Sequence, residues 1–273
     1  MAHPAVTLTC AVALALYLWG LRRVSRRRAA PRGRVLCFAL GVAVAAAALG
    51  DPIDAYADAW FVWHMVQHLL LALVSAPLLL LGAPLLLARQ AAPPWLRRPL
   101  DRALRGRVVG ALTFPVVSWA LFVAVMWGSH YSGLYEVALE HPLAHALEHA
   151  LYLTSALLFW LPVVGIEPSR WRLGHAPRLL YLFLAAGQNA FLGASLYESG
   201  RVLYPHYAEQ HPAQGAALAD QQFGGEAMWI VGSLVTLVAV LLVVAAWMRH
   251  EERVARRREA VEDAAAGRAP AGG

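Results

Sequence analysis

The sequence contains no lysine, so arginine supplies every one of its 23 basic side chains. A retinal chromophore is held as a Schiff base on a lysine amine, and the lack of lysine therefore excludes a rhodopsin-type photoreceptor. The two cysteines, Cys10 and Cys37, form no CxxC pair and provide no disulfide framework. We interpret both as small core residues, with Cys10 also open as a soft metal ligand. Charged residues make up only 15% of the chain, against 59% hydrophobic residues, which excludes a soluble globular domain of this size.

Long apolar runs recur along the chain, each close to the roughly 20 residues that a bilayer requires. They predict an all-α polytopic membrane bundle, because lipid admits only helices and closed barrels and these runs are too long for barrel strands. We expect one seven-helix domain over residues 1–248 and a basic, disordered tail at 249–273. The first run is followed, not preceded, by positive charge, so we expect a retained span rather than a cleaved signal peptide. The predicted spans cover residues 4–21, 34–50, 60–87, 108–127, 143–164, 178–197 and 226–248.

Arginine lies almost entirely on one side of these predicted spans. Seven arginines fall at 22–34, six at 89–107, three at 170–178 and six after the last span, and only Arg201 falls on the other side. The positive-inside rule makes the arginine-rich side cytoplasmic, which places the N-terminus outside and the C-terminus inside. Orientation and contact with anionic lipid explain the net charge of +6, so we expect no nucleic-acid partner.

Most of the histidines belong to the predicted outer side. His64 and His68 are four residues apart and share one helix face, as do His145 and His149. Both pairs lie roughly 5–12 Å below the start of their helices, so neighbouring helices would bring four imidazoles to one level. The outer histidines are His3, His64, His68, His130, His141, His145, His149, His206 and His211. We expect three of these, His3, His206 and His211, to be ordinary loop residues.

This one-sided set predicts a metal site. Imidazole with nearby thioether sulfur suits copper, whereas imidazole alone also suits zinc or iron. The alternative is a hydrogen-bonded structural cluster, but ionisable groups within a membrane are costly and tend to mark function. Gln67, Glu148 and Asp220 are candidates for orienting the rings. The candidate ligands are His64, His68, His130, His141, His145, His149, Met65 and Met228.

Two other metal chemistries stay open at this point. The stretch from His145 to His149 reads HALEH and matches the HxxEH pattern of zinc proteases, with Glu148 as the catalytic carboxylate. Such a site needs a third ligand and room for water, so we favour a chance match within a histidine-rich helix. Paired imidazoles from two helices would also suit the axial ligands of a haem iron.

Two polar side chains and three prolines within the predicted spans have structural interpretations. Gln188 and Asn189 lie in the middle of the sixth span, where we expect hydrogen bonds between helices rather than a transport pathway. Pro77 and Pro115 should kink the third and fourth spans, and Pro162 should lie near the end of the fifth.

Three stretches in register resemble a known family. They are HMVQHLLLALVSAPLLLLGAP (64–84), SHYSGLYEVALEHPLAHALEH (129–149) and LYPHYAEQ with ALADQQFGGEAMW within 203–229. Together, over roughly residues 50–248, they resemble the CtaG-type seven-helix cytochrome c oxidase assembly factors of bacteria. The functional residues that the resemblance implies are His64, His68, His130, His141, His145, His149, Asp220, Gln221, Gln222, Met228 and Trp229.

The resemblance implies a non-enzymatic, multi-pass protein of the bacterial plasma membrane that helps to mature a haem-copper oxidase. Copper is then the expected cargo, with zinc or haem as less favoured ligands. The expected partners are an oxidase subunit, other copper chaperones and membrane lipid. The segment 198–225, the longest predicted outer loop, is expected to be a lid or a docking surface. A metal-free scaffold for oxidase assembly is the main alternative.

Overall fold

A computed structural model describes residues 3–25, 31–211, 213 and 215–266, and every regular element within them is helical. The predicted all-α class is therefore confirmed. The helices are α1 (His3–Ser25), α2 (Arg32–Ala48), α3 (Ile53–Ala59), α4 (Phe61–Leu69), α5 (Ala76–Leu81), α6 (Pro84–Ala91), α7 (Pro94–Leu104), α8 (Arg107–Leu112), α9 (Pro115–Tyr131), α10 (Leu134–Glu140), α11 (Pro142–Val164), α12 (His175–Tyr197), α13 (Pro205–Gln210) and α14 (Ala216–Ala266).

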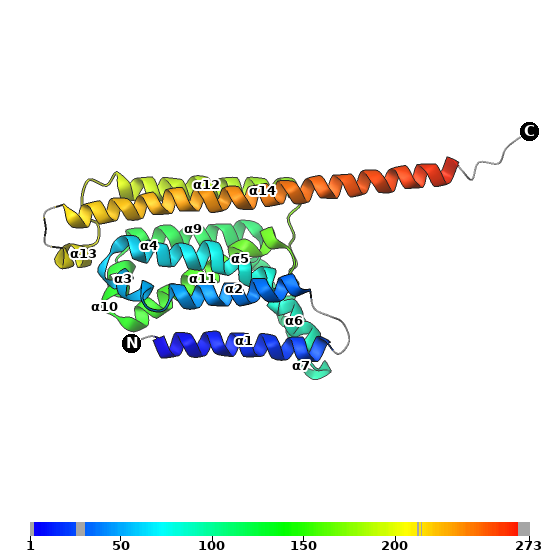
Figure 1. Cartoon of the computed structure of the whole chain (residues 1–273), viewed down its shortest axis with the longest axis horizontal. Helices are drawn as coiled ribbons and strands as arrows, with labels where there is room; N and C mark the ends of the chain where they lie inside the picture. Colours follow the sequence, from blue (N-terminus) through cyan, green and yellow to red (C-terminus); the bar gives the residue numbers. More distant parts are fainter. Residues whose placement is uncertain (1–2, 26–30, 212, 214, 267–273) are drawn as a thin grey trace, which may run out of the picture.

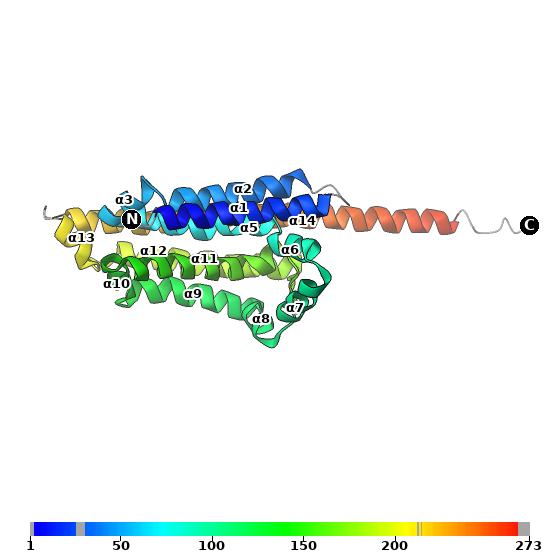
Figure 2. The ribbon, with the colours of Figure 1, turned by 90° about the horizontal axis from the view of Figure 1, so that it is seen from below.

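The long helices run side by side along one axis of an elongated bundle (Figure 1). The short helices α3, α10 and α13 gather at the end where α1 begins, whereas α6, α7 and α8 lie at the opposite end (Figure 2). Arginine is concentrated at this second end, beyond which α14 projects (Figure 1). The end that carries α3, α10 and α13 is therefore the one that the arginine distribution predicts to be extracytoplasmic.

Five helical segments of the described chain are long and apolar enough to cross a membrane, and a sixth is formed if α2 and α3, bent by 41°, make one span. The predicted fourth span, at 108–127, is divided between α8 and the 17-residue α9. A multi-pass membrane protein is thus supported, while the count of seven spans and the orientation of the termini stay predictions. The five segments are Pro4–Val24, Phe61–Ala91, Pro142–Val164, His175–Tyr197 and Ala216–Glu262.

Proline explains where the long helices are interrupted. A π-helical turn at Leu70–Ser75 joins α4 to α5 directly before Pro77, whose ring nitrogen cannot donate to the preceding turn. Pro115 is the first residue of α9, after the break that separates it from α8. Pro162 lies in the last turn of α11, and Gly165, in the left-handed conformation, caps the end of this helix. The kinks predicted at Pro77 and Pro115 are thus a π-helical turn before Pro77 and a complete break before Pro115.

The main core lies between α4, α5, α9, α11, α12 and α14, and α1 is peripheral, packing on α2 and α6. Helices α12 and α14 approach closely, because a Cβ atom on Gly193 would lie 2.6 Å from the main-chain oxygen of Gly225. Asn189 of α12 donates a hydrogen bond to the Met228 carbonyl of α14, and Trp127 of α9 donates one to Gln188. The expected interhelical hydrogen bonding of both polar residues is confirmed.

The C-terminal part differs from our prediction of a disordered tail at 249–273. Helix α14 is continuous from Ala216 to Ala266, and residues 267–273 lie outside the described part of the chain. No glycine or proline occurs between Gly232 and Gly267, and acidic and basic side chains four residues apart, such as Glu252 and Arg256, favour helix. The last helix also begins at Ala216 rather than 226, so the predicted loop at 198–225 contains α13 and the first turns of α14.

Candidate metal centre

Helix α4 carries His64 and His68, and a carboxylate from a distant helix fixes its start. Asp220 of α14 accepts hydrogen bonds from the main-chain N–H groups of Phe61, at 2.6 Å, and Val62, at 3.2 Å. A carboxylate there satisfies unpaired N–H groups and opposes the positive end of the helix dipole. Asp220 was expected to orient the rings or to bind a partner. Its hydrogen bonds are with the backbone of α4, so it positions the helix that carries His64 and His68, and a role in partner binding stays a prediction.

Helix α11 supplies the second group of ligands. Its first residue is Pro142, and the next turns present His145, Glu148 and His149 toward α4. Glu148 and His149 are buried and His145 is half-buried. His141 precedes the helix and is exposed. Its ligand atoms do not converge with those of the other histidines, so the structure does not bring this predicted ligand together with them.

The side chains of α4 and α11 converge as the sequence predicted. The Nε2 atoms of His64 and His68 are 3.0 Å apart, and the Glu148 carboxylate lies 3.6 Å from His64 Nε2 and 3.9 Å from His68 Nε2. The ring centroid of His145 lies 5.4 Å from that of His64 and 4.3 Å from that of His149. We call these five residues, His64, His68, His145, Glu148 and His149, the imidazole cluster.

Two sets of ligand atoms within the imidazole cluster suit a cation, and His64 belongs to both. One set is His64, His145 and His149, the other is His64, His68 and Glu148, and in each the ligand atoms lie within 4.8 Å of one another. Nitrogen ligands at about 2.0 Å from one tetrahedral ion stand roughly 3.3 Å apart. Modest side-chain movement is therefore enough for either set to close on a single ion.

Several buried polar atoms of the imidazole cluster have no hydrogen-bond partner within the described residues. They are Nδ1 of His68, Nε2 of His145 and both carboxylate oxygens of Glu148. Buried polar groups are normally paired, because an unpaired one loses its water without compensation. A bound cation would supply the missing partner for His145 Nε2 and for the Glu148 oxygens, so these residues fit a metal ion. His68 faces the cluster through Nε2, and its Nδ1 atom lies on the other side of the ring.

Hydrogen bonds behind the cluster select which nitrogen faces it. His149 donates through Nε2 to the Gln67 side-chain oxygen, at 3.2 Å, and Gln67 donates to Asp54, at 3.0 Å. The Gln67 amide is thereby held with its oxygen toward His149, which leaves the Nδ1 lone pair of His149 free for a ligand. Gln67 was expected to orient the rings. Asp54 was not anticipated, although it lies in an acidic segment on the same side.

Tyrosines from two short helices complete the surroundings of His64. The Tyr207 hydroxyl of α13 donates to the Ala57 carbonyl, at 2.9 Å, and lies 3.5 Å from His64 Nδ1. The ring of Tyr135 of α10 lies 4.8 Å from the His64 ring. Burial raises the pKa of both Tyr135 and Tyr207, so each stays a neutral hydroxyl and neither is an anionic ligand. Sequence spacing gave no indication of these two tyrosines.

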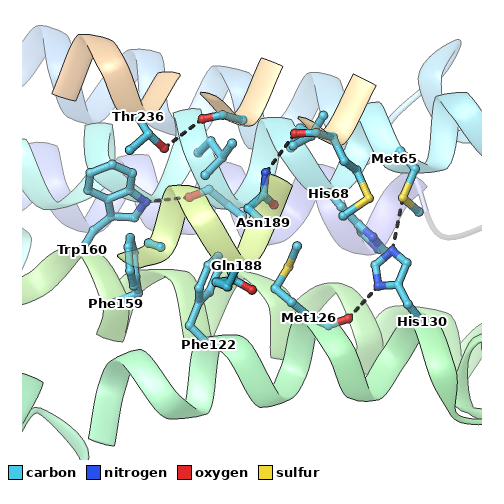
Figure 3. Close-up of a pocket in the computed structure, with 16 residues that line it drawn as sticks. Met65, His68, Phe122, Met126, His130, Phe159, Trp160, Gln188, Asn189 and Thr236 are labelled. Carbon is cyan, nitrogen blue, oxygen red and sulfur yellow. Dashed lines mark hydrogen bonds between the residues drawn. The ribbon is translucent and has the colours of Figure 1, made fainter. Parts of the chain in front are cut away.

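Three predicted ligands lie apart from the imidazole cluster. His130, Met65 and Met228 line a cavity of about 20 Å³ together with Met126, while His68 lines the same cavity and also belongs to the imidazole cluster (Figure 3). His130 Nε2 is 3.3 Å from the Met65 sulfur. The single His/Met cluster expected from the sequence is therefore divided in the structure into two neighbouring groups.

The remaining predicted residues contact neither group of ligands directly. Gln221 accepts from the Leu203 N–H and donates to the Leu196 and Arg201 carbonyls, and so fixes the segment between α12 and α13. Gln222 donates to the Tyr197 carbonyl. Trp229 is 48% exposed on α14. Cys10, considered as a soft ligand, packs between α1 and α2.

Comparison with known proteins places the chain among membrane assembly factors. A family model described as cytochrome c oxidase caa3 assembly factor matches residues 15–250. Uncharacterized proteins of Mycobacterium bovis and Mycobacterium tuberculosis are each 29% identical over 253 residues, and one of Mycobacterium leprae is 26% identical. The match covers 89% of this chain but only 38% of each relative's length. No solved structure matches. The family match, which extends over most of the sequence, confirms the resemblance: the chain belongs to the cytochrome c oxidase caa3 assembly factor family.

Proposed function

We propose that this protein assists assembly of a haem-copper oxidase by holding copper in the imidazole cluster and passing it to an oxidase subunit. The family supports the assembly role. The observation that carries the copper proposal is the convergence of four imidazoles and one carboxylate, several of whose buried ligand atoms lack partners. Copper binds more tightly than the other divalent first-row metals to nitrogen and oxygen ligands of this kind.

The position of the cluster suits exchange of the ion with a partner. It lies near the end of the bundle that the arginine pattern predicts to be extracytoplasmic. Within it, His145 is only half-buried, and exposed His141 lies one turn above it on the same chain segment. We assign to His145 the ligand through which copper enters and leaves, with His141 at the mouth of that path.

Helix α13 is the proposed cover of the site. Tyr207 of α13 bonds to the Ala57 carbonyl, and His211, just beyond α13, donates to the Ala59 carbonyl at 2.7 Å. Both acceptors lie in or at the end of α3, directly before the helix that carries His64 and His68. Gln210 also donates to the Asp58 carbonyl, at 3.1 Å. Loosening these hydrogen bonds would uncover His64 without disturbing the long helices, which favours the lid among the two roles expected of this segment, a lid or a docking surface.

The test is metal analysis of the purified chain beside its absorption spectrum. We expect about one Cu(II) per chain, with nitrogen hyperfine structure in the electron paramagnetic resonance spectrum, and loss of this copper in the His64→Ala/His145→Ala double variant. The matched control is His175→Ala/His250→Ala, because these two imidazoles, 5.5 Å apart, lie at the opposite end of the bundle. Unchanged copper content in the first double variant would refute the proposal.

The same measurements distinguish the other assignments. A Soret band would indicate haem, although the close packing of the imidazole rings favours a bare ion. Zinc with hydrolytic activity that is lost in Glu148→Gln would indicate a hydrolase. Absence of metal together with co-purification of oxidase subunits would indicate a metal-free scaffold.

A further inference from the structure

A second group of soft ligands lies beside the imidazole cluster, around the cavity of about 20 Å³. It is contributed by Met65 of α4, Met126 and His130 of α9, and Met228 of α14. Each of these four side chains is at most 4% exposed. A cavity needs roughly 10–15 Å³ to hold one water molecule, so this cavity also has room for an ion without its water shell.

The protonation of His130 follows from its neighbours. Its Nδ1 atom is 2.6 Å from the Met126 main-chain oxygen, which can only accept, whereas the hydroxyls of Ser129 and Tyr152 lie farther away, at 3.2 and 3.4 Å. The nearest partner therefore places the proton on Nδ1. In the neutral ring, Nε2 then presents a lone pair, and the atom that it faces at 3.3 Å is the Met65 sulfur (Figure 3). A thioether sulfur is a weak acceptor and has no proton to donate. Two electron-pair donors thus face each other inside the bundle with no hydrogen between them.

This arrangement fits two ligands of one ion. Nitrogen at about 2.0 Å and sulfur at about 2.3 Å from a tetrahedral ion stand roughly 3.5 Å apart, close to the observed separation. The main-chain acceptor on Nδ1 is also the support that metal-bound histidine usually has, since it fixes the tautomer and the ring orientation. Figure 3 shows Met126 extending from α9 into the same cavity, which Met228 lines from α14.

We propose that Met65, Met126, Met228 and His130 form a second metal site that is specific for a soft monovalent cation. In the cell, the ion bound at this site would be Cu(I). Thioether sulfur selects Cu(I) over divalent ions, whereas the imidazoles and carboxylate of the outer cluster also accept divalent copper. The identification of the cell's ion as copper rests on the proposed function. The existence of a soft-cation site rests only on the arrangement of these four side chains around the cavity.

His68 connects the two sites. Its Nε2 atom faces His64 at 3.0 Å, its ring stacks on Tyr152 at 3.7 Å, and its side chain lines the thioether cavity. A Cu(I) ion that leaves the imidazole cluster therefore meets the thioether site with His68 as the shared boundary, and it moves without a change of oxidation state. The inner site would hold Cu(I) in reserve beneath the outer site from which copper is exchanged.

Silver(I) is the probe, because it is soft, monovalent and does not change oxidation state under these conditions. The full chain carries Cys10→Ala and Cys37→Ala, so that thiols do not bind silver, and Ag(I) is measured by elemental analysis after gel filtration. We expect about one Ag(I) per chain, lost in the Met65→Leu/Met126→Leu/Met228→Leu variant, since leucine has nearly the same volume without the sulfur. The matched control is Met248→Leu, which makes the same change at an exposed position of α14.

X-ray absorption of the Cu(I)-loaded chain gives an independent reading. We expect sulfur scattering at about 2.3 Å that disappears in the triple variant. Should the triple variant fail to accumulate, the single Met65→Leu change is expected to weaken Ag(I) binding at least tenfold. Unchanged silver binding in these methionine variants, or no silver binding by the parent chain, would overturn the second site.

These experiments test the imidazole cluster and the thioether site independently of each other. The His64→Ala/His145→Ala variant should lose Cu(II) and keep Ag(I), while the methionine variant should lose Ag(I) and keep Cu(II). If the parent chain binds Ag(I) but no Cu(II), the proposed function is refuted and the soft-cation site stands. If the parent chain binds Cu(II) but no Ag(I), the soft-cation site is refuted and the proposed function stands.

Discussion

Replacing Asp220 by alanine tests whether this residue positions the helix that carries half of the imidazole cluster. The side chain accepts two hydrogen bonds from the start of α4, at 2.6 and 3.2 Å, and is 3% exposed. Hydrogen bonds to a charged group contribute about 1.5–3 kcal/mol each, and loss of a helix cap costs about 0.5–2 kcal/mol. We therefore expect Asp220→Ala to lower the free energy of unfolding by about 3 kcal/mol.

Two further variants separate capping from charge. Asp220→Asn keeps one carbonyl oxygen for an N–H group of α4, so we expect it to cost only about 1 kcal/mol. Glu226→Gln is the matched control, since it removes an acidic group from the same helix α14 without a hydrogen bond to α4. The assay is unfolding of the purified chain in mixed micelles on titration with a denaturing detergent, followed by circular dichroism, with Cu(II) affinity measured in parallel.

Comparing the stability and the copper affinity of these variants shows whether Asp220 acts as a helix cap. We expect stability and copper affinity to fall together in the alanine variant and to recover largely in the asparagine variant, because α4 fixes where His64 and His68 lie. An alanine variant within about 0.5 kcal/mol of the parent chain would refute the capping argument. Loss of copper at unchanged stability would instead make Asp220 a ligand or a docking residue.

Two other predictions concern ring orientation and helix packing. Gln67→Leu removes the acceptor that holds His149 Nε2–H. Cu(II) affinity should therefore fall about 10–100-fold in a competition titration, while the fold is kept. An unchanged affinity would show that this hydrogen bond does not set the tautomer of His149. Gly193→Ala places a methyl group 2.6 Å from the Gly225 oxygen and should destabilise the chain by about 1–3 kcal/mol in the same unfolding assay. The control is Gly187→Ala, whose methyl group would meet nothing within 4 Å and should not destabilise the chain. Equal stability of the two glycine variants would contradict the close approach of α12 and α14.

Local helix geometry is the part of the site that could be predicted. A spacing of four residues places His64 with His68, and His145 with His149, on one helix face whatever the surrounding fold is. The depth of each pair follows from counting residues from the start of its helix, and both pairs do meet in the structure. A disturbance of the helix at Pro115 was predictable for the same reason, since the missing N–H is a property of the residue itself, although a kink was expected and the structure has a break.

Contacts between segments far apart in the sequence were not predictable in the same way. Asp54 acts on His149 only through Gln67, and Asp220 reaches α4 across 159 positions of the chain. The separation of His130 from the imidazole cluster likewise depends on how α9 packs against α4 and α11. None of these contacts leaves a periodic signal, because each depends on which helices become neighbours.

By itself the sequence determined the helical class, the family, the one-sided arginine distribution and the two pairs of imidazoles, because each of these depends on composition or on spacing along one helix. Only the tertiary structure decided that α4 and α11 face each other, that Asp220 fixes the start of α4, and that the methionines surround a cavity of their own. The physical reason is that helix neighbours are chosen by close packing over the whole bundle, at small residues such as Gly193 and Gly225, and such packing has no counterpart in the order of residues along the chain.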